Sequence, residues 1–281
     1  MGSVTETEPN LRELFGEALE LWRKATNAAE YDNIWPVLDQ AAGFARGALD
    51  VSLYFLKTDD VARRAVSADL LGRLALTGDE FHDAIGAGLT ERLEIEDDVD
   101  VIWSILTALV PVRAVSAVPK LLEYASSTMA PFRLQAVRAL GRLLSAMPED
   151  ASLTSTIVNG MEDTDGLVRA EATSVAATQL PLENAEVSDA LGKRLFDPED
   201  PPRLLAIHGL ALRRDPRALD AIRYSLERDV VPARVFASAM VLADPTLIPN
   251  LEAANHSNLD DARFEAVLEA CRNGTPVRPP A

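Results

Sequence analysis

The sequence is poor in cysteine, histidine and aromatic residues. Of 281 residues, one is Cys, three are His and 5% are Phe, Trp or Tyr. The single cysteine, Cys271, excludes an internal disulfide and any metal site built only from cysteines. His82, His208 and His256 lack a second ligand at metal-binding spacing. We therefore expect no metal, no cofactor and a reducing compartment, which is typical of the cytoplasm.

Long apolar runs are also missing. No stretch approaches the roughly 20 apolar residues of a membrane-spanning helix. Residues 1–9 contain neither the basic start nor the apolar core of a signal peptide. These absences predict a soluble, cytoplasmic protein that does not bind membranes.

Positive charge is scarce relative to negative charge. The chain has 27 Lys and Arg against 44 Asp and Glu, which gives a formal net charge of −17. A field of this sign repels phosphate backbones and anionic lipids, and it attracts basic proteins. We therefore predict no nucleic-acid ligand and a protein partner, for which a basic protein is one candidate.

A short motif is repeated along the chain. Residues 165–177 read Asp-Gly-Leu-Val-Arg-Ala-Glu-Ala-Thr-Ser-Val-Ala-Ala, and residues 132–141 are the clearest copy. Its arginine recurs at Arg64, Arg133, Arg169, Arg203, Arg234 and Arg263, with Ile102 at the corresponding place in a degenerate copy. Successive positions differ by 38, 31, 36, 34, 31 and 29 residues, the length of a two-helix repeat. First helices are expected near 79–94, 115–126, 150–161, 184–196, 215–227 and 244–254.

The motif has a physical interpretation. At 3.6 residues per turn, Val168, Ala172 and Val175 share one face, and small alanines allow neighbouring helices to approach closely. Arg169 lies beside this face, where its guanidinium can reach an Asp of a turn. The spacing predicts a structural Asp/Arg ladder with the pairs Asp165–Arg169, Asp60–Arg64 and Asp200–Arg203. Its members are Asp60, Arg64, Arg133, Asp165, Arg169, Asp200, Arg203, Arg234, Asp260 and Arg263. A row of arginines for phosphate is the weaker alternative, because an Asp lies near these arginines and the chain is acidic.

On these residues the chain resembles the HEAT repeat superfamily, and it is most similar to the bacterial HEAT-like repeats first named for phycobilisome lyases. The resemblance covers about residues 58–272 and is weakest at 98–110, where Ile102 and Trp103 replace the Arg pattern. It implies an all-α, right-handed α-solenoid of about seven two-helix repeats, with second helices lining the concave side. It implies scaffolding more than any activity, because a fold does not fix function.

The resemblance and the composition suggest four segments. We expect a disordered lead at 1–9, an N-terminal helical cap at 10–57, the solenoid at 58–272 and a disordered tail at 273–281. Proline disfavours helix in the preceding residue, so the cap is expected to break near Trp35 and Pro36. The cap is rich in aromatic residues: Phe15, Trp22, Tyr31, Trp35, Phe44, Tyr54 and Phe55. They either seal the open end of the solenoid or form an aromatic ligand pocket or partner surface.

The candidate binding residues are the second-helix positions just outside the core stripe. They are Trp103, Thr107, Arg138, Arg142, Ser174, His208, Phe236 and Phe264, and we expect them to line one concave groove. Aromatic residues and arginine are enriched among the anchors of protein interfaces.

No catalytic motif is present. Iron-binding deoxyhypusine hydroxylases with HEAT-like repeats use His-Glu pairs, but Asp83, Gly209 and Ser257 follow the three histidines here. The acidic run at 94–100 lacks the glycine and ligand spacing of a calcium loop. The predicted function is therefore a non-catalytic protein-binding scaffold or adaptor. Two alternatives are a HEAT-like enzyme or enzyme-associated protein, of lyase or DNA glycosylase type, with a concave ligand pocket, and an acidic protein that neutralises a basic partner.

Overall fold

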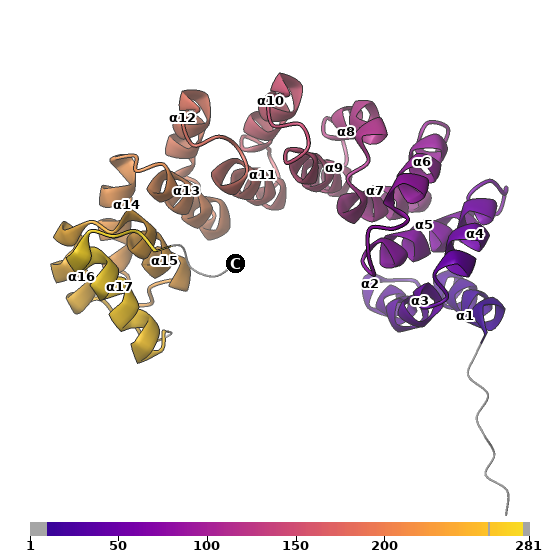
Figure 1. Ribbon diagram of the computed structural model, residues 1–281, viewed down its shortest axis with the longest axis horizontal. Helices are drawn as coiled ribbons and strands as arrows, with labels where there is room; N and C mark the ends of the chain where they lie inside the picture. Colours follow the sequence, from indigo (N-terminus) through magenta and orange to yellow (C-terminus); the bar gives the residue numbers. More distant parts are fainter. Residues whose placement is uncertain (1–9, 258, 278–281) are drawn as a thin grey trace, which may run out of the picture. The chain divides into compact units, whose positions relative to one another are not determined.

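The computed structural model describes residues 10–257 and 259–277 (Figure 1). Within these ranges the chain consists of α-helices and short 3₁₀ turns, without a strand. The helices stack in antiparallel pairs, so the predicted all-α solenoid class is confirmed. The expected disordered lead at 1–9 lies outside the described residues. The chain divides into two compact units, Met1–Leu143 and Leu144–Ala281, called unit 1 and unit 2 below.

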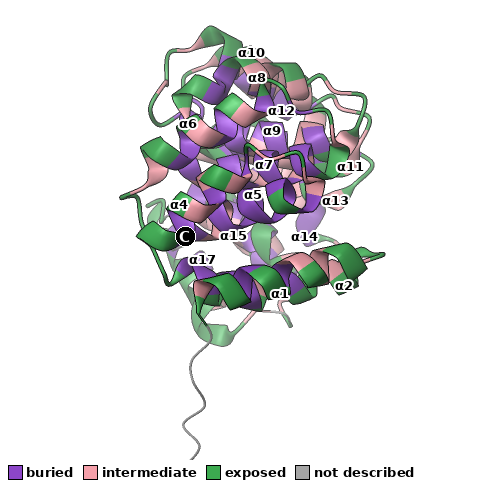
Figure 2. Cartoon of the chain, turned by 90° about the vertical axis from the view of Figure 1, so that its right-hand side faces the viewer, coloured by how far each residue is buried: buried purple, intermediate pink, exposed green. Residues whose placement is uncertain are grey.

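Unit 1 opens with four helices in the segment where the sequence predicts a cap. These helices are α1 (Leu11–Lys24), α2 (Ala28–Tyr31), α3 (Trp35–Ala42) and α4 (Arg46–Phe55), with the 3₁₀ turn η1 (Asp32–Ile34) before α3. Helices α1, α3 and α4 pack against α5 (Val61–Ala75). Figure 2 shows that α1 has both buried and exposed residues, as expected for a helix that covers the end of a stack. The helix tightens into η1 before Trp35, but Trp35 itself keeps helical backbone angles (φ −61°, ψ −45°), so the break predicted there is wrong. Pro36 lies in the first turn of α3, where its missing N–H costs no hydrogen bond. A turn that was not predicted occurs at Ala45, whose φ is 45°.

The rest of unit 1 alternates first and second helices. The first helices are α6 (His82–Leu93) and α8 (Val118–Tyr124), the latter preceded by η2 (Val115–Ala117). The second helices are α7 (Val99–Val112) and α9 (Ala130–Leu143), which continue the row that α5 begins. Helix α7 packs on α5, on α9 and on its first helix α6, because apolar residues occupy more than one side of it, and α9 packs on α7 and on its first helix α8.

Unit 2 repeats the pattern. Its first helices are α10 (Ala151–Gly160), α12 (Ala185–Arg194), α14 (Arg217–Leu226) and α16 (Ile248–Ala253), with η3 (Pro245–Leu247) before α16. Its second helices are α11 (Gly166–Thr178), α13 (Asp200–Leu212), α15 (Ala233–Leu242) and α17 (Asp261–Asn273). The expected first helices agree with those observed to within a turn. In the described part of the segment predicted as a tail, the Val277 N–H donates to the Met240 carbonyl at 3.3 Å. The rest of that segment, from residue 278, lies outside the described residues.

Aspartates begin many of these helices. Asp165 Oδ1 accepts hydrogen bonds from the amides of Leu167 and Val168 at 2.9 and 3.2 Å, and Asp60 caps α5 in the same way through the Arg63 amide at 3.1 Å. These carboxylates satisfy amides that have no partner within the helix. Asp60 and Asp165 therefore serve as helix caps and not as the predicted partners of Arg64 and Arg169.

The arginines of the motif share a different contact. In Arg64, Arg133, Arg169 and Arg203, Nη1 donates to the carbonyl of the residue six positions earlier, at 3.1, 3.0, 2.9 and 2.5 Å. Each guanidinium thus binds the turn that joins the first helix to the second. This contact explains the periodic spacing of the arginines better than a pairing with the neighbouring aspartate.

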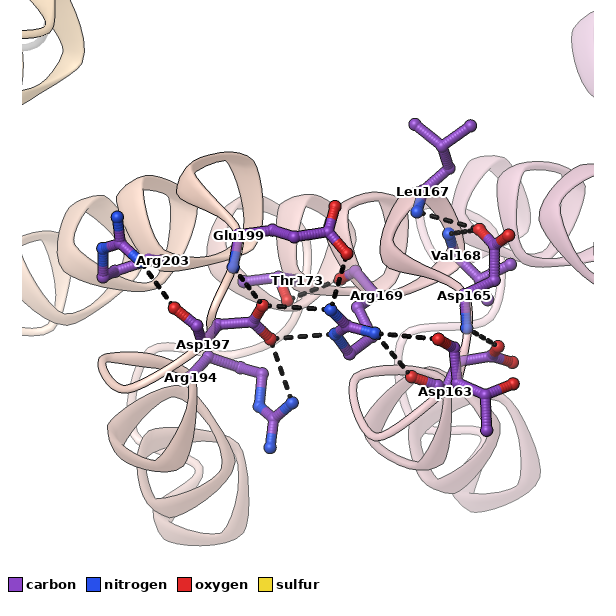
Figure 3. Close-up of polar contacts among 11 residues, drawn as sticks. Asp163, Asp165, Leu167, Val168, Arg169, Thr173, Arg194, Asp197, Glu199 and Arg203 are labelled. Carbon is purple, nitrogen blue, oxygen red and sulfur yellow. Dashed lines mark hydrogen bonds and ion pairs between the residues drawn. The ribbon is translucent and has the colours of Figure 1, made fainter.

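The remaining guanidinium nitrogens of two arginines reach a carboxylate of the following repeat. Arg169 binds Asp197 through Nε at 2.9 Å and Nη2 at 3.1 Å, and Figure 3 shows this fork between α11 and the turn before α13. Arg64 binds Glu96 in the same manner, at 2.9 and 3.1 Å. Arg203 does pair with Asp200, as predicted.

The predicted ladder weakens toward the end of unit 2. Arg263 lies 3.2 Å from Asp260, in a pair whose side chains are 78% and 58% exposed. Arg234 is exposed at the start of α15. Exposed pairs of this kind stabilise a fold little.

Candidate functional site

Aromatic side chains from the cap and from α7 line a groove in unit 1. The groove has a volume of about 780 Å³. We call it the aromatic groove, and its walls are Trp22, Arg23, Ala25, Thr26, Asn27, Ala28, Tyr31, Asp32, Trp35, Val99, Asp100, Trp103, Thr107, Met129, Pro131 and Phe132. The chain has three tryptophans, and all three belong to this set.

The rings of the groove are held in place but not covered. Trp22, Tyr31, Trp35 and Trp103 are half-buried, whereas Phe132 is buried. Tyr31 and Trp35 meet edge to face, with centroids 5.7 Å apart and an interplanar angle of 73°. The Trp35 indole donates to Asp32 Oδ1 at 3.2 Å, which fixes the ring. Half-buried rings offer both an apolar surface and an electron-rich face to a ligand.

A smaller hollow adjoins the aromatic groove and shares Trp35 and Thr107 with it. Its volume is about 330 Å³, and Asp69, Arg73 and Arg138 also line it. The Arg73 guanidinium lies over the Trp35 ring, 5.7 Å from its centroid, and Arg73 Nε donates to Asp39 Oδ1 at 2.6 Å. Trp35 therefore already holds one cation on its surface.

A buried carboxyl group connects the hollow to the groove. The Tyr31 hydroxyl donates to Asp69 Oδ2, and Asp69 is 4% exposed. Burial raises the pKa of Asp69 to about 6, although the hydrogen bond from Tyr31 opposes the shift. Burial and the charge of Asp69 also raise the pKa of Tyr31. Asp69 can therefore exchange a proton near neutral pH.

The rim of the aromatic groove is acidic. Asp32 and Asp100 are exposed on it, and Asp100 is close enough to contribute to the raised pKa of Tyr31. Arg23 is the one basic side chain among the described groove residues, and its Nη2 binds Asp60 at 3.0 Å. The local charge of the groove is therefore negative.

The structure brings some of the predicted binding residues together. Trp103 and Thr107 line the aromatic groove, and Thr107 and Arg138 line the adjoining hollow. Arg142 is exposed near the end of α9 and is not part of either wall.

The predicted residues of unit 2 behave differently. Ser174 and His208 are half-buried on α11 and α13, and His208 Nδ1 lies 3.3 Å from the Ser238 hydroxyl. Phe236 is 1% exposed and packs edge to face on Phe264, with centroids 5.9 Å apart. Phe236 is therefore a core residue and not the predicted surface residue, because α17 covers its side of α15.

None of the three histidines lines the aromatic groove or the adjoining hollow. His82 Nε2 lies 2.9 Å from the Ala75 carbonyl, and His256 stacks on Phe264 at 3.9 Å. Burial, together with the charge of Arg234, lowers the pKa of His208 to about 4. Across residues 10–257 and 259–277, no group of three or more His, Cys, Asp or Glu is placed to hold a metal.

The acidic run at 94–100 has a structural role. The Glu96 carboxylate accepts hydrogen bonds from Arg64 and Arg92, and from the amides of Asp97 and Asp98. Burial would raise the pKa of Glu96, but the hydrogen bonds from Arg92 and Arg64 lower it to about 2. Asp98 caps α7. Glu96 and Asp98 are thus occupied by protein groups, in agreement with the absence of a calcium-loop pattern.

Sequence reasoning missed several residues of this site, Asp69 among them, and named others only in an alternative interpretation. Asp69 was not a candidate, because no local pattern marks it, and Asp100 was considered only as part of the acidic run at 94–100. Trp22, Tyr31 and Trp35 appeared only in the alternative interpretation of the cap as an aromatic pocket. Their concentration in the first helices was the available signal.

Unit 2 contains a separate hollow of about 890 Å³ beside α12 and α14. Phe196 and Tyr224 lie on it, 87% and 76% exposed. Its arginines are already bound to carboxylates: Arg203 and Arg228 to Asp200, and Arg217 to Asp215. This hollow has no tryptophan among the described residues of its walls. Its exposed Tyr224 therefore provides a control position for variants of the aromatic groove.

Comparisons with known proteins agree on the fold. No family model matches the chain. The chain is 28% identical over 134 residues to protein YibA of Escherichia coli strain K12, and equally to that of strain O157:H7. These matches cover 48% of the chain, and the chain spans about half (47%) of the length of these curated relatives.

Solved structures extend the likeness over most of the chain. The crystal structure of Escherichia coli YibA superposes with a TM-score of 0.67 at 19% identity, over 95% of this chain and 98% of YibA. An engineered protein superposes with a TM-score of 0.59 at 19% identity, over 91% and 77% of the two chains. At these identities the likeness establishes the helical-repeat fold alone. None of the described helices is both long enough and apolar enough to cross a bilayer.

Proposed function

We propose that this chain is a non-catalytic, protein-binding scaffold of HEAT-like type, and that its second helices and cap carry the binding surface. The observation that supports the proposal most strongly is the aromatic groove, where Trp22, Trp35 and Trp103 keep accessible ring faces. Tryptophan is costly to leave in contact with water and is the residue most enriched among interface anchors. Such a surface gains free energy when a partner covers it.

Further features agree with this proposal. Stacked repeats provide extended surfaces for binding other proteins. Arg138 in the adjoining hollow would enlarge the contact area beside the groove. The net charge of −17 favours a basic protein as partner, and a cytoplasmic location agrees with the single cysteine.

The test begins with capture of partners from a lysate of the native cells by the full chain. A captured protein is then purified and titrated against the wild type, Trp103→Ala and Tyr224→Ala. We expect Trp103→Ala to weaken binding by about 1–2 kcal/mol, because it removes an anchor, and Tyr224→Ala in unit 2 to be neutral. Circular dichroism and thermal melting establish that both variants fold. A costly Tyr224→Ala together with a neutral Trp103→Ala would place the binding surface on unit 2.

The buried Asp69 favours a second candidate function, an enzyme with a ligand pocket in unit 1. Its carboxyl group has a pKa of about 6 and lies beside the groove, as a general acid or base would. This candidate ranks lower because Tyr31 is the side chain that occupies the Asp69 carboxylate, and no histidine converges on it. A metabolite that stabilises the wild type and is turned over by it, but not by Asp69→Asn, would establish the second candidate.

A further inference from the structure

The aromatic groove combines accessible ring faces with carboxylates. Resting on the proposed function, we propose that the groove receives a lysine or arginine side chain of the protein partner, held between the faces of Trp103 and its neighbouring rings and near Asp100. This assigns the partner's chemistry: a basic segment that inserts a cation into an aromatic and acidic cleft.

The rings of unit 1 already bind cations. The Arg73 guanidinium lies 5.7 Å from the centroid of Trp35, and the Arg63 guanidinium lies 5.0 Å from that of Phe55. Indole is the strongest of the aromatic side chains in this interaction, because its face carries the most negative potential. Trp22 and Trp103 are half-buried in the same groove, and no such contact to a cation of the described chain is found for either ring.

The charges of the groove favour the same ligand. Asp100 and Asp32 are exposed at its rim, and Arg23 is bound to Asp60. An incoming ammonium or guanidinium would meet carboxylates within a chain of net charge −17. A purely apolar side chain would instead remove these carboxylates from water without providing a partner for them. A phosphate would be repelled.

The size of the groove agrees with a peptide segment. Its volume of about 780 Å³ lies within the range of ligand-binding clefts. This volume exceeds the needs of one side chain, so the residues next to the cation would also contact the walls. Met129 and Pro131 at the start of α9 provide apolar contacts for the stem of the cationic side chain.

Fluorescence of the full chain can test the proposal directly, because all three tryptophans line the groove. The probe is an acetylated and amidated Gly-Gly-Lys-Gly-Gly peptide, and the matched control carries norleucine in place of lysine. We expect a saturable change in fluorescence with a Kd of about 1 mM for the lysine peptide, and binding at least about 10-fold weaker for the norleucine peptide. Equal affinities, or no saturable change up to about 10 mM lysine peptide, would overturn the proposal.

Two variants locate the cation. Asp100→Asn should weaken the lysine peptide about 3- to 10-fold, while Glu186→Gln, which removes the same charge from α12 of unit 2, should leave its affinity unchanged. Trp103→Leu should weaken binding of the lysine peptide at least about 5-fold, and the fluorescence of Trp22 and Trp35 would still detect this binding. If Trp103→Leu fails to fold, the proposal is tested by the affinity of Asp100→Asn for the lysine peptide and by the affinity of the wild type for the norleucine peptide. Equal effects of Asp100→Asn and Glu186→Gln would show a general effect of net charge and contradict a specific site.

The outcomes separate this inference from the proposed function. A captured partner that requires Trp103 but binds equally well after its lysines and arginines are replaced would overturn the inference and leave the scaffold function intact. Specific binding of the lysine peptide by a chain that captures no protein would support the cation site and contradict the scaffold function. Tighter binding of 1-methyladenosine than of the lysine peptide would assign the groove to a cationic base and overturn the inference.

Discussion

At the scale of single residues, the repeat arginine shows what local spacing can and cannot predict. The recurrence of Arg169 and its equivalents predicted ion pairs at repeat intervals, and Arg64, Arg169 and Arg203 do make ion pairs. The predicted partner was the nearest aspartate, Asp165, but that carboxylate caps α11. The actual partner, Asp197, lies 28 residues later and approaches only when the next repeat stacks. Because the contact with Asp197 forms between stacked repeats, the residues next to Arg169 in the sequence do not indicate its partner.

Removal of Arg169 should therefore be costly. Its side chain is 9% exposed and that of Asp197 is 0% exposed, and Arg169→Ala would leave Asp197 with Arg194 alone as an ionic partner. We expect a loss of about 2–4 kcal/mol in the free energy of unfolding, since a buried carboxylate loses a bidentate hydrogen bond. The matched control is Arg263→Ala in an exposed pair, with an expected loss below about 0.5 kcal/mol. Urea denaturation measures both, and equal losses would contradict the structural role of the buried pair.

Asp69 should make stability depend on pH. Its pKa is about 6 in the folded chain against 3.8 for the free side chain, so its contribution is fully present below about pH 4 and is lost as the pH rises through 6. Asp69→Asn removes this titration and can still accept the Tyr31 hydrogen bond. At pH 8 we expect the variant to exceed the wild type in stability by on the order of 2 kcal/mol, with little difference at pH 4. Denaturation curves at the two pH values measure this, and a constant difference between the chains would show that Asp69 keeps its ordinary pKa.

At the scale of helices, sequence patterns predicted the repeats well because their signals are local. Aspartate caps and alanine faces mark where the helices after residue 58 begin and pack, and the observed elements follow them. The break at Ala45 was not predicted, because alanine carries no turn signal and the conformation depends on packing of α4 against α5. Phe236 was placed on the surface because a shift of one residue rotates a helical position by about 100°.

Close packing between second helices makes a glycine essential. A Cβ atom at Gly209 would lie 2.7 Å from the Ala177 Cβ and 3.0 Å from its Cα, and the latter cannot move without α11. Gly209→Ala should destabilise the fold by about 1–3 kcal/mol despite the higher helix propensity of alanine. Gly16→Ala is the control, since nothing lies within 4 Å of that position, and it should stabilise α1 by roughly 0.5–1 kcal/mol. Chemical denaturation that shows both glycines responding alike would contradict the close approach of α11 and α13.

At the scale of the whole molecule, the fold class and the sign of the charge followed from composition and periodicity. The aromatic groove did not, because it combines the cap with α7 and α9, and residues such as Trp22 and Trp103 are far apart in sequence. The clustering of aromatic residues in residues 10–57 was compatible both with a cap over the open end of the solenoid and with a ligand pocket or partner surface. The aromatic residues of these helices occupy both kinds of position, since Phe15 is buried and Trp22 lines the groove.

The whole-molecule charge leads to a prediction about nucleic acid. Duplex DNA binding depends on lysines and arginines that displace counterions from phosphates, and this chain has 27 such residues against 44 acidic ones. Two of the motif arginines are buried against carboxylates, Arg64 against Glu96 and Arg169 against Asp197. We expect no detectable binding to duplex DNA near physiological salt in a fluorescence anisotropy titration. Micromolar affinity with a steep dependence on salt would contradict this expectation, and it would favour the glycosylase-like alternative over a protein-binding scaffold.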